Sequence, residues 1–315
     1  MALQDGAAVT RTPAKNVVTG ADTRGGALAA IAAYGTWGVL PLLFHQLMPV
    51  DPVLVVAHRT LWSLVFVTAL IGIGGRFSEV RAVLADARSL RVMFISALLL
   101  GCNWLLYVWA VQNGRVLEGS LGYFINPLVN VAIGMVLLGE KQNRWQMVAI
   151  AIAAVAIVIQ GVALGTVPWV SLGLAGTFGF YGYFRKTVAA PSAIGLFVET
   201  LLLSPFALGF AVYSWVTHGP GALTDPYILG LVIFTGPATA IPLLFFAYAV
   251  RQLRMTTAGM IQYISPSLQF LLGVLAFGEH LSLVGLLSFA LIWLSLVTFT
   301  VDGYKNRPAR AIGAI

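Results

Sequence analysis

An apolar segment long enough to cross a lipid bilayer occurs twice in this 315-residue chain. The first copy, residues 119–140, reads GSLGYFINPLVNVAIGMVLLGE, and the second, residues 258–279, reads AGMIQYISPSLQFLLGVLAFGE. A proline inside a helix removes a backbone donor and clashes with the preceding turn. The matched prolines, Pro127 and Pro266, therefore predict the same helix break twice. Paired interruptions in duplicated hydrophobic halves are typical of transporters with a binding site near the bilayer midplane.

The composition indicates an all-α integral membrane protein. Hydrophobic residues make up 59% of the chain and charged residues 9%, whereas soluble domains carry about 25% charged residues. The net charge of +7 comes from short loops between apolar runs, which indicates membrane orientation and no nucleic-acid partner. Cys102 is the only cysteine, so neither an intrachain disulfide nor a CxxC metal site is expected. Residues 1–24 have no apolar core, so we expect no cleaved signal peptide.

Ten apolar segments of about 20 residues predict ten transmembrane helices, since about 20 residues at 1.5 Å each cross about 30 Å of hydrocarbon. Nearly all of the 18 Lys and Arg residues fall in alternate loops and in the two tails. By the positive-inside rule these loops and both termini are expected in the cytoplasm. The predicted segments are 27–48, 52–73, 90–111, 117–138, 145–164, 168–188, 191–215, 226–250, 256–277 and 281–301.

Five spans in each half is an odd number, so the second half is expected to lie inverted relative to the first. Lys141 and Arg144 follow the first Gly-Glu pair, whereas no Lys or Arg follows Glu279 closely. A further repeated motif is YGTWG at 34–38, which matches FGFYG at 178–182. Inverted repeats of this kind are associated with alternating access. The expected units are a cytoplasmic tail 1–25, a first repeat 26–164, an inverted second repeat 165–303 and a cytoplasmic tail 304–315.

Several motifs identify a family resemblance that covers about residues 26–303. They are HRTLWS at 58–63, GCNWLLYVWAV at 101–111, EGSLGYFINPLVN at 118–130, FYGYFRK at 180–186 and LRMTTAGMIQYISP at 253–266. With these motifs the chain resembles RarD-type members of the EamA group in the drug/metabolite transporter superfamily. The resemblance implies a ten-span carrier of the bacterial inner membrane, built from two inverted five-helix halves and linked in that family with chloramphenicol.

Two charged residues lie well inside the predicted spans, Arg59 and Glu199. Placing such a charge in a span costs at least about 2.5–3.5 kcal/mol, so each should face a cavity or a partner. Arg59 can reach the outer surface by snorkelling, form a structural contact, or contact the solute. Glu199 is either neutralised by Arg185 or Lys186 or serves as a proton-coupling carboxylate. A direct bond between Arg59 and Glu199 is not expected, because the inverted repeat directs them to opposite faces.

Aromatic and amide side chains cluster at the depth of the two prolines. Irregular backbone at this depth is tolerated only where it faces protein or water, and such side chains suit a small organic molecule with flat and polar parts. For each residue a packing or hydrogen-bonding role within the helix bundle is the alternative. The predicted solute-binding residues are Trp37, Arg59, Asn103, Trp104, Tyr107, Tyr123, Asn126, Asn130, Gln262 and Tyr263.

Two acidic residues follow glycines that can end a helix in the left-handed conformation. These are Glu140 and Glu279, and we expect both to be helix-cap or hairpin residues.

The chain contains no HExxH, GxxxxGK[ST], GxSxG or Asp-rich metal motif, and its four histidines have no metal-ligand spacing. No catalytic residue, metal or cofactor is therefore expected. The predicted function is secondary transport of small organic metabolites or drugs by alternating access, with export as the direction. A gradient-driven uniporter of amino acids or related metabolites stays open, as does a membrane-embedded enzyme or lipid-handling protein. The expected partners are a small-molecule solute and the lipid bilayer, and a homodimer stays open.

Overall fold

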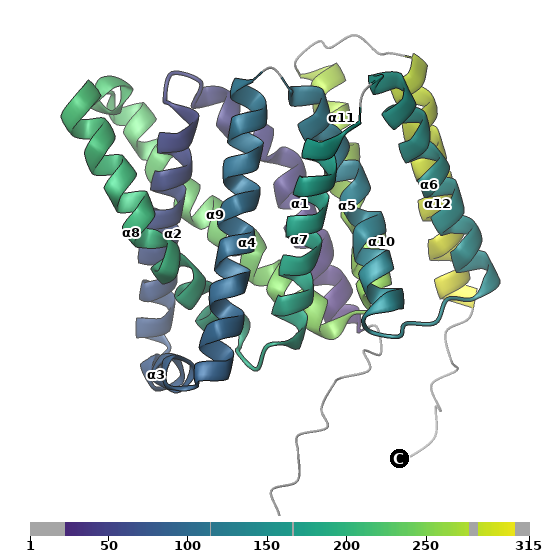
Figure 1. Ribbon diagram of the computed structural model, residues 1–315, viewed down its shortest axis with the longest axis horizontal. Coiled ribbons are helices and arrows are strands. Elements are labelled where there is room, and N and C mark those ends of the chain that lie inside the picture. The colour runs from purple at the N-terminus through teal and green to yellow at the C-terminus, as the bar shows by residue number, and fades with distance from the viewer. Residues whose placement is uncertain (1–22, 114, 166, 277–282, 306–315) are drawn as a thin grey trace, which may run out of the picture.

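The computed structural model describes residues 23–113, 115–165, 167–276 and 283–305, and every regular element in these ranges is helical (Figure 1). The elements are α1 (Arg24–Gln46), α2 (Pro52–Ile73), α3 (Phe77–Ala85), α4 (Ala87–Gln112), α5 (Val116–Val136), α6 (Arg144–Leu164), α7 (Trp169–Thr187), α8 (Ser192–His218), the 3₁₀ helix η1 (Gly221–Thr224), α9 (Pro226–Gln252), α10 (Met255–Gln262), α11 (Ile264–Leu275) and α12 (Leu283–Lys305).

Seven of the described helices are long and apolar enough to cross a membrane: α1, α2, α4, α6, α8, α9 and α12. A shorter apolar stretch, Leu121–Val136, lies within α5. Each predicted segment coincides with a helix, and the ninth coincides with the α10–α11 pair. The all-helical, multi-span class predicted from composition is therefore confirmed.

The short helix α3 lies where the sequence predicts only a loop. Its residues Val80 and Val83, three positions apart, are buried, because positions i and i+3 share one face of a helix. Near its start, Arg76 and Glu79 form an exposed ion pair at 2.6 Å. The segment is too short to cross a bilayer, which is why a search for apolar runs of about 20 residues does not find it.

The predicted helix break at Pro127 is wrong, whereas the second copy does break, at Tyr263. Helix α5 continues through Pro127, but α10 ends and α11 begins on either side of Tyr263. Pro266 then falls in the first turn of α11, where backbone N–H groups lack intrahelical partners in any case. Beside Pro127, α10 packs so closely that a Cβ on Gly259 would lie 2.6 Å from the Pro127 carbonyl oxygen. Neighbouring helices thus support α5 across its proline.

Helices from the two halves of the chain interlock throughout the bundle. Helix α1 packs against α9, α2 against α8 and α9, α5 against α7 and α10, and α6 against α12. Figure 1 shows the α6–α12 pair at one edge and the α2–α8 pair at the other. Each of these pairs joins a helix before residue 165 to one after it, so neither half is packed without the other.

Basic residues gather at one end of the bundle, which we call the basic face. Lys186 Nζ donates hydrogen bonds to the carbonyl oxygens of Val250 (2.8 Å) and Leu253 (2.5 Å). Arg251 donates to the Ala190 carbonyl oxygen. In Figure 1 helix α1 begins and helix α12 ends at this face. The basic face is defined by Arg24, Lys141, Arg185, Lys186, Arg251, Arg254 and Lys305.

The approach of α2 to α9 gives a direct test of the packing. A Cβ added at Gly236 would lie 2.5 Å from the backbone carbonyl carbon of Trp62, and Ser63 Oγ donates to the Gly236 carbonyl oxygen at 3.0 Å. We predict that Gly236→Ala lowers the free energy of unfolding by about 1–3 kcal/mol, measured by unfolding in detergent. Gly35→Ala is the matched control, because nothing lies within 4 Å of a Cβ there. Equal stability of the two variants would contradict this contact.

Candidate functional site

A cavity of about 180 Å³ lies between α1, α2, α4, α5, α7, α9 and the α10–α11 pair. Its lining joins residues that are far apart in the sequence, from Tyr34 to Gln269. The structure brings together most of the predicted solute-binding residues here, and Pro266 with them. The predicted residues in the lining are Trp37, Arg59, Asn103, Trp104, Tyr107, Tyr123, Asn126 and Gln262.

The cavity occupies one half of the depth of the bundle. Its lining residues nearest to the basic face, such as Tyr34, Phe178 and Gln262, lie about 7–10 residues from the helix ends at that face. At 1.5 Å per residue this is about 10–15 Å of filled protein. At the other end, Phe44 and Val56 line the cavity within about four residues of their helix ends. The cavity therefore extends from mid-depth toward the face opposite the basic face.

Arg59 contributes the cationic group of the cavity. Its guanidinium carbon lies 4.4 Å from the ring centre of Trp104 and 5.7 Å from that of Phe44, and Nε donates to Thr239 Oγ1 at 3.1 Å. Within the described ranges no carboxylate lies at ion-pair distance from it. The side chain is thus held by aromatic rings and a hydroxyl, which leaves its positive charge without an opposite charge in the described structure.

Three amide side chains form a junction between α5 and α10. Asn130 Nδ2 donates to Gln262 Oε1 at 2.8 Å and to Asn126 Oδ1 at 3.2 Å. Because both carbonyl oxygens face Asn130, the amide NH₂ groups of Asn126 and Gln262 are the ones available to the cavity. Asn130 itself lies behind the cavity wall, contrary to the sequence prediction, and orients the two amides that do line it.

Tyr263 also lies outside the cavity lining, contrary to the prediction. It is fully buried with Phe124 and Met260 in a separate apolar cluster. Successive helical residues point about 100° apart, and here Gln262 faces the cavity while Tyr263 turns into the apolar cluster. The Tyr263 hydroxyl has no hydrogen-bond partner among the described residues.

Aromatic rings close the cavity toward the basic face. The ring centre of Trp37 lies 5.6 Å from those of Tyr34 and Phe178 and 5.7 Å from that of Phe246. The lining residues Tyr34, Phe178 and Gln269 are missing from the prediction. Tyr34 and Phe178 belong to the matched motifs YGTWG and FGFYG, so the internal repeat carries the signal that locates this aromatic floor.

Glu199 lies beneath the aromatic floor and not in the cavity lining. Its fully buried carboxylate accepts hydrogen bonds from Ser96 Oγ at 2.5 Å and Tyr181 Oη at 3.3 Å. Arg185 Nη1 lies 3.8 Å from it, whereas Lys186 donates to backbone carbonyls instead. Of the two interpretations, neutralisation by Arg185 fits this geometry. Proton coupling through Glu199 stays a prediction.

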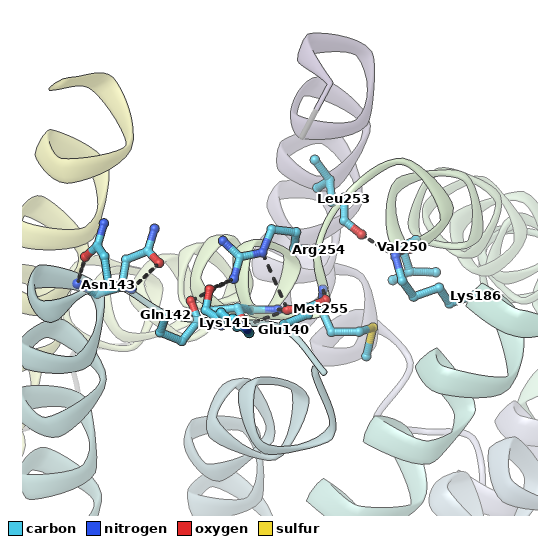
Figure 2. A network of polar contacts seen from close by, with 11 residues as sticks. Glu140, Lys141, Gln142, Asn143, Lys186, Val250, Leu253, Arg254 and Met255 are labelled. Atoms are coloured by element: carbon cyan, nitrogen blue, oxygen red, sulfur yellow. Dashed lines mark hydrogen bonds and ion pairs between the residues drawn. The ribbon is translucent and has the colours of Figure 1, made fainter. Parts of the chain in front are cut away.

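At the basic face, Glu140 caps a helix of the opposite half (Figure 2). It accepts hydrogen bonds from the backbone N–H groups of Met255 (2.5 Å) and Thr256 (3.0 Å) and from Thr256 Oγ1 (2.7 Å). A carboxylate at a helix N-terminus satisfies free donors and favours the helix dipole. Gly139 precedes it with φ of 67°. Glu140 therefore ties the end of α5 to the start of α10, and Glu279 lies outside the described residues.

Comparison with known proteins places this architecture in a family. The EamA-like transporter family matches residues 24–162. An uncharacterized transporter of Vibrio cholerae is 41% identical over 90% of this chain and 94% of its own length. Protein RarD of Escherichia coli K12 is 40% identical over 90% and 97%. A chloramphenicol-sensitive protein RarD of Pseudomonas aeruginosa is 31% identical over 86% and 92%. The chain belongs to the EamA-like transporter family and is of the RarD type.

A solved structure supports the fold independently. A crystal structure of a protein only 18% identical superimposes with a TM-score of 0.68, over 90% of this chain and 99% of that one. The family and the apolar helices together define a membrane transporter, a multi-pass protein of the inner membrane that handles a small-molecule solute.

The buried pair beneath the floor gives a second test. Glu199→Gln leaves Arg185 buried without its carboxylate, so we predict a loss of about 3–5 kcal/mol in the free energy of unfolding. Glu79→Gln is the control, because it removes an exposed ion pair with Arg76, which we expect to cost less than about 1 kcal/mol. Unfolding in detergent measures both, and a loss at Glu199 no larger than at Glu79 would show that the buried pair is not structural.

Proposed function

We propose that the protein is a secondary transporter that moves a small organic metabolite or drug across the bacterial inner membrane by alternating access, with export as the direction. The observation that carries this proposal is the cavity, which extends to one face of the bundle and is closed toward the other. Solute sites of secondary transporters lie near mid-depth at the interface of two repeats. The cavity has the same position, because its walls come from both halves of the chain.

The proposed topology has ten transmembrane helices in two inverted repeats, 26–164 and 165–303, with tails 1–25 and 304–315 in the cytoplasm. Under the positive-inside rule the basic face is cytoplasmic. The interlocked helix pairs support this arrangement, since every principal contact joins one half to the other. With this orientation the structure corresponds to a state open to the outside.

In the proposed cycle the basic face opens while the opposite face closes. Opening requires Glu140 to separate from the start of α10. It also requires the hydrogen bond from Arg254 Nη2 to the Lys141 carbonyl oxygen, 2.6 Å long, to break (Figure 2). The Arg254 hydrogen bond is exposed, whereas the Glu140 side chain is only 9% exposed. Opening must therefore bring water to a largely buried carboxylate.

Two alternatives remain to be distinguished by experiment. A gradient-driven uniporter would use the same cavity, but its solute flux would not depend on a pH gradient. A membrane-embedded enzyme or lipid-handling protein would convert its substrate in detergent, without a second compartment. We assign the chain no catalytic residue, cofactor or metal, and we leave open whether it forms a homodimer.

A flux assay tests the proposal. A screen of amino acids, nucleosides and antibiotics for raised unfolding temperature selects compounds, whose flux is measured in proteoliposomes with and without a pH gradient. We expect Gln262→Ala to lower flux about 3- to 10-fold, since it removes a cavity hydrogen bond. Tyr263→Phe should leave flux unchanged, because the hydroxyl it removes is buried without a partner among the described residues.

The pH gradient separates the coupling mechanisms. Acceleration by the gradient that disappears in Glu199→Gln supports proton coupling through this carboxylate. Flux that is the same with and without the gradient, in the unchanged protein and in Glu199→Gln, supports the uniporter. No protein-dependent flux for any compound that binds would contradict the transport proposal.

A further inference from the structure

We propose that the cavity binds its solute as a monoanion, a small organic acid with one carboxylate and a flat apolar body, and that Arg59 binds the carboxylate. This inference rests on the proposed transport function, because it names the solute class of the same cavity. It goes further in excluding amines and in ranking zwitterions below simple acids.

The first observation in favour of an anion is the charge of the cavity. Arg59 is the one charged residue in the described lining. Another arginine near the same end of the bundle, Arg115, has its charge balanced by an acid. It forms an ion pair with Glu118 at 2.8 Å and lies over the rings of Trp109 and Trp169. Arg59 has comparable ring contacts but no acid among the described residues. A ligand carboxylate would supply the missing opposite charge.

The second observation is that Arg59 has hydrogen-bond donors left for a ligand. A guanidinium has five N–H donors and no acceptor. In the described structure the Nε–H has Thr239 Oγ1 as its acceptor, and no other hydrogen bond is formed by the side chain. The Nη groups therefore remain for a ligand, and guanidinium and carboxylate form paired parallel hydrogen bonds. The Trp104 ring centre lies 4.4 Å from the guanidinium carbon and so packs against the group.

The other amides of the cavity divide into donors and acceptors. Asn130 engages the carbonyl oxygens of Asn126 and Gln262, so these two amides present their NH₂ groups to the cavity. Asn103 uses its own NH₂ group on the Leu174 carbonyl and on Thr177. Gln269, like Asn103, uses its NH₂ group within the protein, on the Trp37 carbonyl oxygen and Ser265 Oγ, so its own carbonyl oxygen is the group left for the cavity. No acidic side chain of the described lining could receive an ammonium group. The charge of Arg59, with no acid in the described lining to balance it, favours an anion over a cation of the same shape.

The size and walls of the cavity define the body of the ligand. A cavity of about 150 Å³ holds one benzene molecule, and this one measures about 180 Å³. Trp37, Phe178 and Trp104 line it, and aromatic rings attract another ring in offset or edge contacts. A single ring with a short acidic side chain matches both the volume and the walls.

A matched series of probes tests the inference on the purified full-length chain. The acids are benzoate, 3-phenylpropionate and indole-3-acetate, and each is compared with its neutral amide by isothermal titration calorimetry and by tryptophan fluorescence. We expect the acids to bind about 10- to 100-fold more tightly than the amides, as for hydrogen bonds to a charged group. Phenylalanine, which adds an ammonium to 3-phenylpropionate, should bind more weakly than 3-phenylpropionate, and phenethylamine should not bind.

Variants assign the effect to Arg59. Arg59→Gln should bring the acid-to-amide ratio of affinities close to one while the amide affinity stays the same. Arg59→Lys should keep part of the preference, since the charge remains but the paired geometry is lost. Arg115→Gln is the control, because it removes an arginine over tryptophan rings outside the cavity lining, and it should keep the full ratio.

The outcomes separate this inference from the transport proposal. Failure of all three acids to bind, equal binding of acids and amides, or an acid preference that survives Arg59→Gln would each overturn the anion assignment. Flux of a neutral or cationic compound that is unaffected by Arg59→Gln would overturn it while the transport function stands. Arg59-dependent binding of an acid without flux in proteoliposomes would uphold the anion site and overturn the transport function.

Discussion

The hydrogen bonds of the Glu140 carboxylate to the start of α10 are the contact on which the observed state depends. They join the last residue of the first repeated segment to the first turn of α10, which leads into the second segment. With this end closed, the cavity lies on the other side of the aromatic floor. A carboxylate is well suited to the task, because it satisfies the free donors of a helix N-terminus and favours the helix dipole. In the proposed cycle this contact holds one state and separates in the other.

The lipid environment explains where the polar side chains lie. Within the bilayer a polar group needs a partner inside the protein, and most of those described here have one. Glu199 is bound by Ser96, Tyr181 and Arg185, and Asn130 holds two amides in place. Arg59 differs from Glu199 because its charge faces the cavity without an opposite charge among the described residues. A solute in the cavity can supply that opposite charge.

The sequence predicts the helices well because apolar runs of bilayer length leave few alternatives. Most of the predicted solute-binding residues do lie in the cavity wall, since polar and aromatic residues at the depth of Pro127 and Pro266 have few other places to face. The sequence does not separate Gln262 from Tyr263, because their directions depend on where α10 ends. Nor does it show that α5 continues through Pro127, since support from neighbouring helices is a tertiary effect. The partner of Glu199 could be narrowed to Arg185 or Lys186, but only packing distinguishes them.

The central claim is that solute passes only when the contact at the basic face separates. Gln142 Nε2 donates to Thr256 Oγ1 across this contact at 2.7 Å, so cysteines at these two positions, in a Cys102→Ser background, can be joined by a short thiol cross-linker. The account predicts that cross-linking stops flux in proteoliposomes, whereas a cross-link between Asn143 and Asp302, on helices that do not line the cavity, leaves it unchanged. Full flux with residues 142 and 256 joined would contradict it.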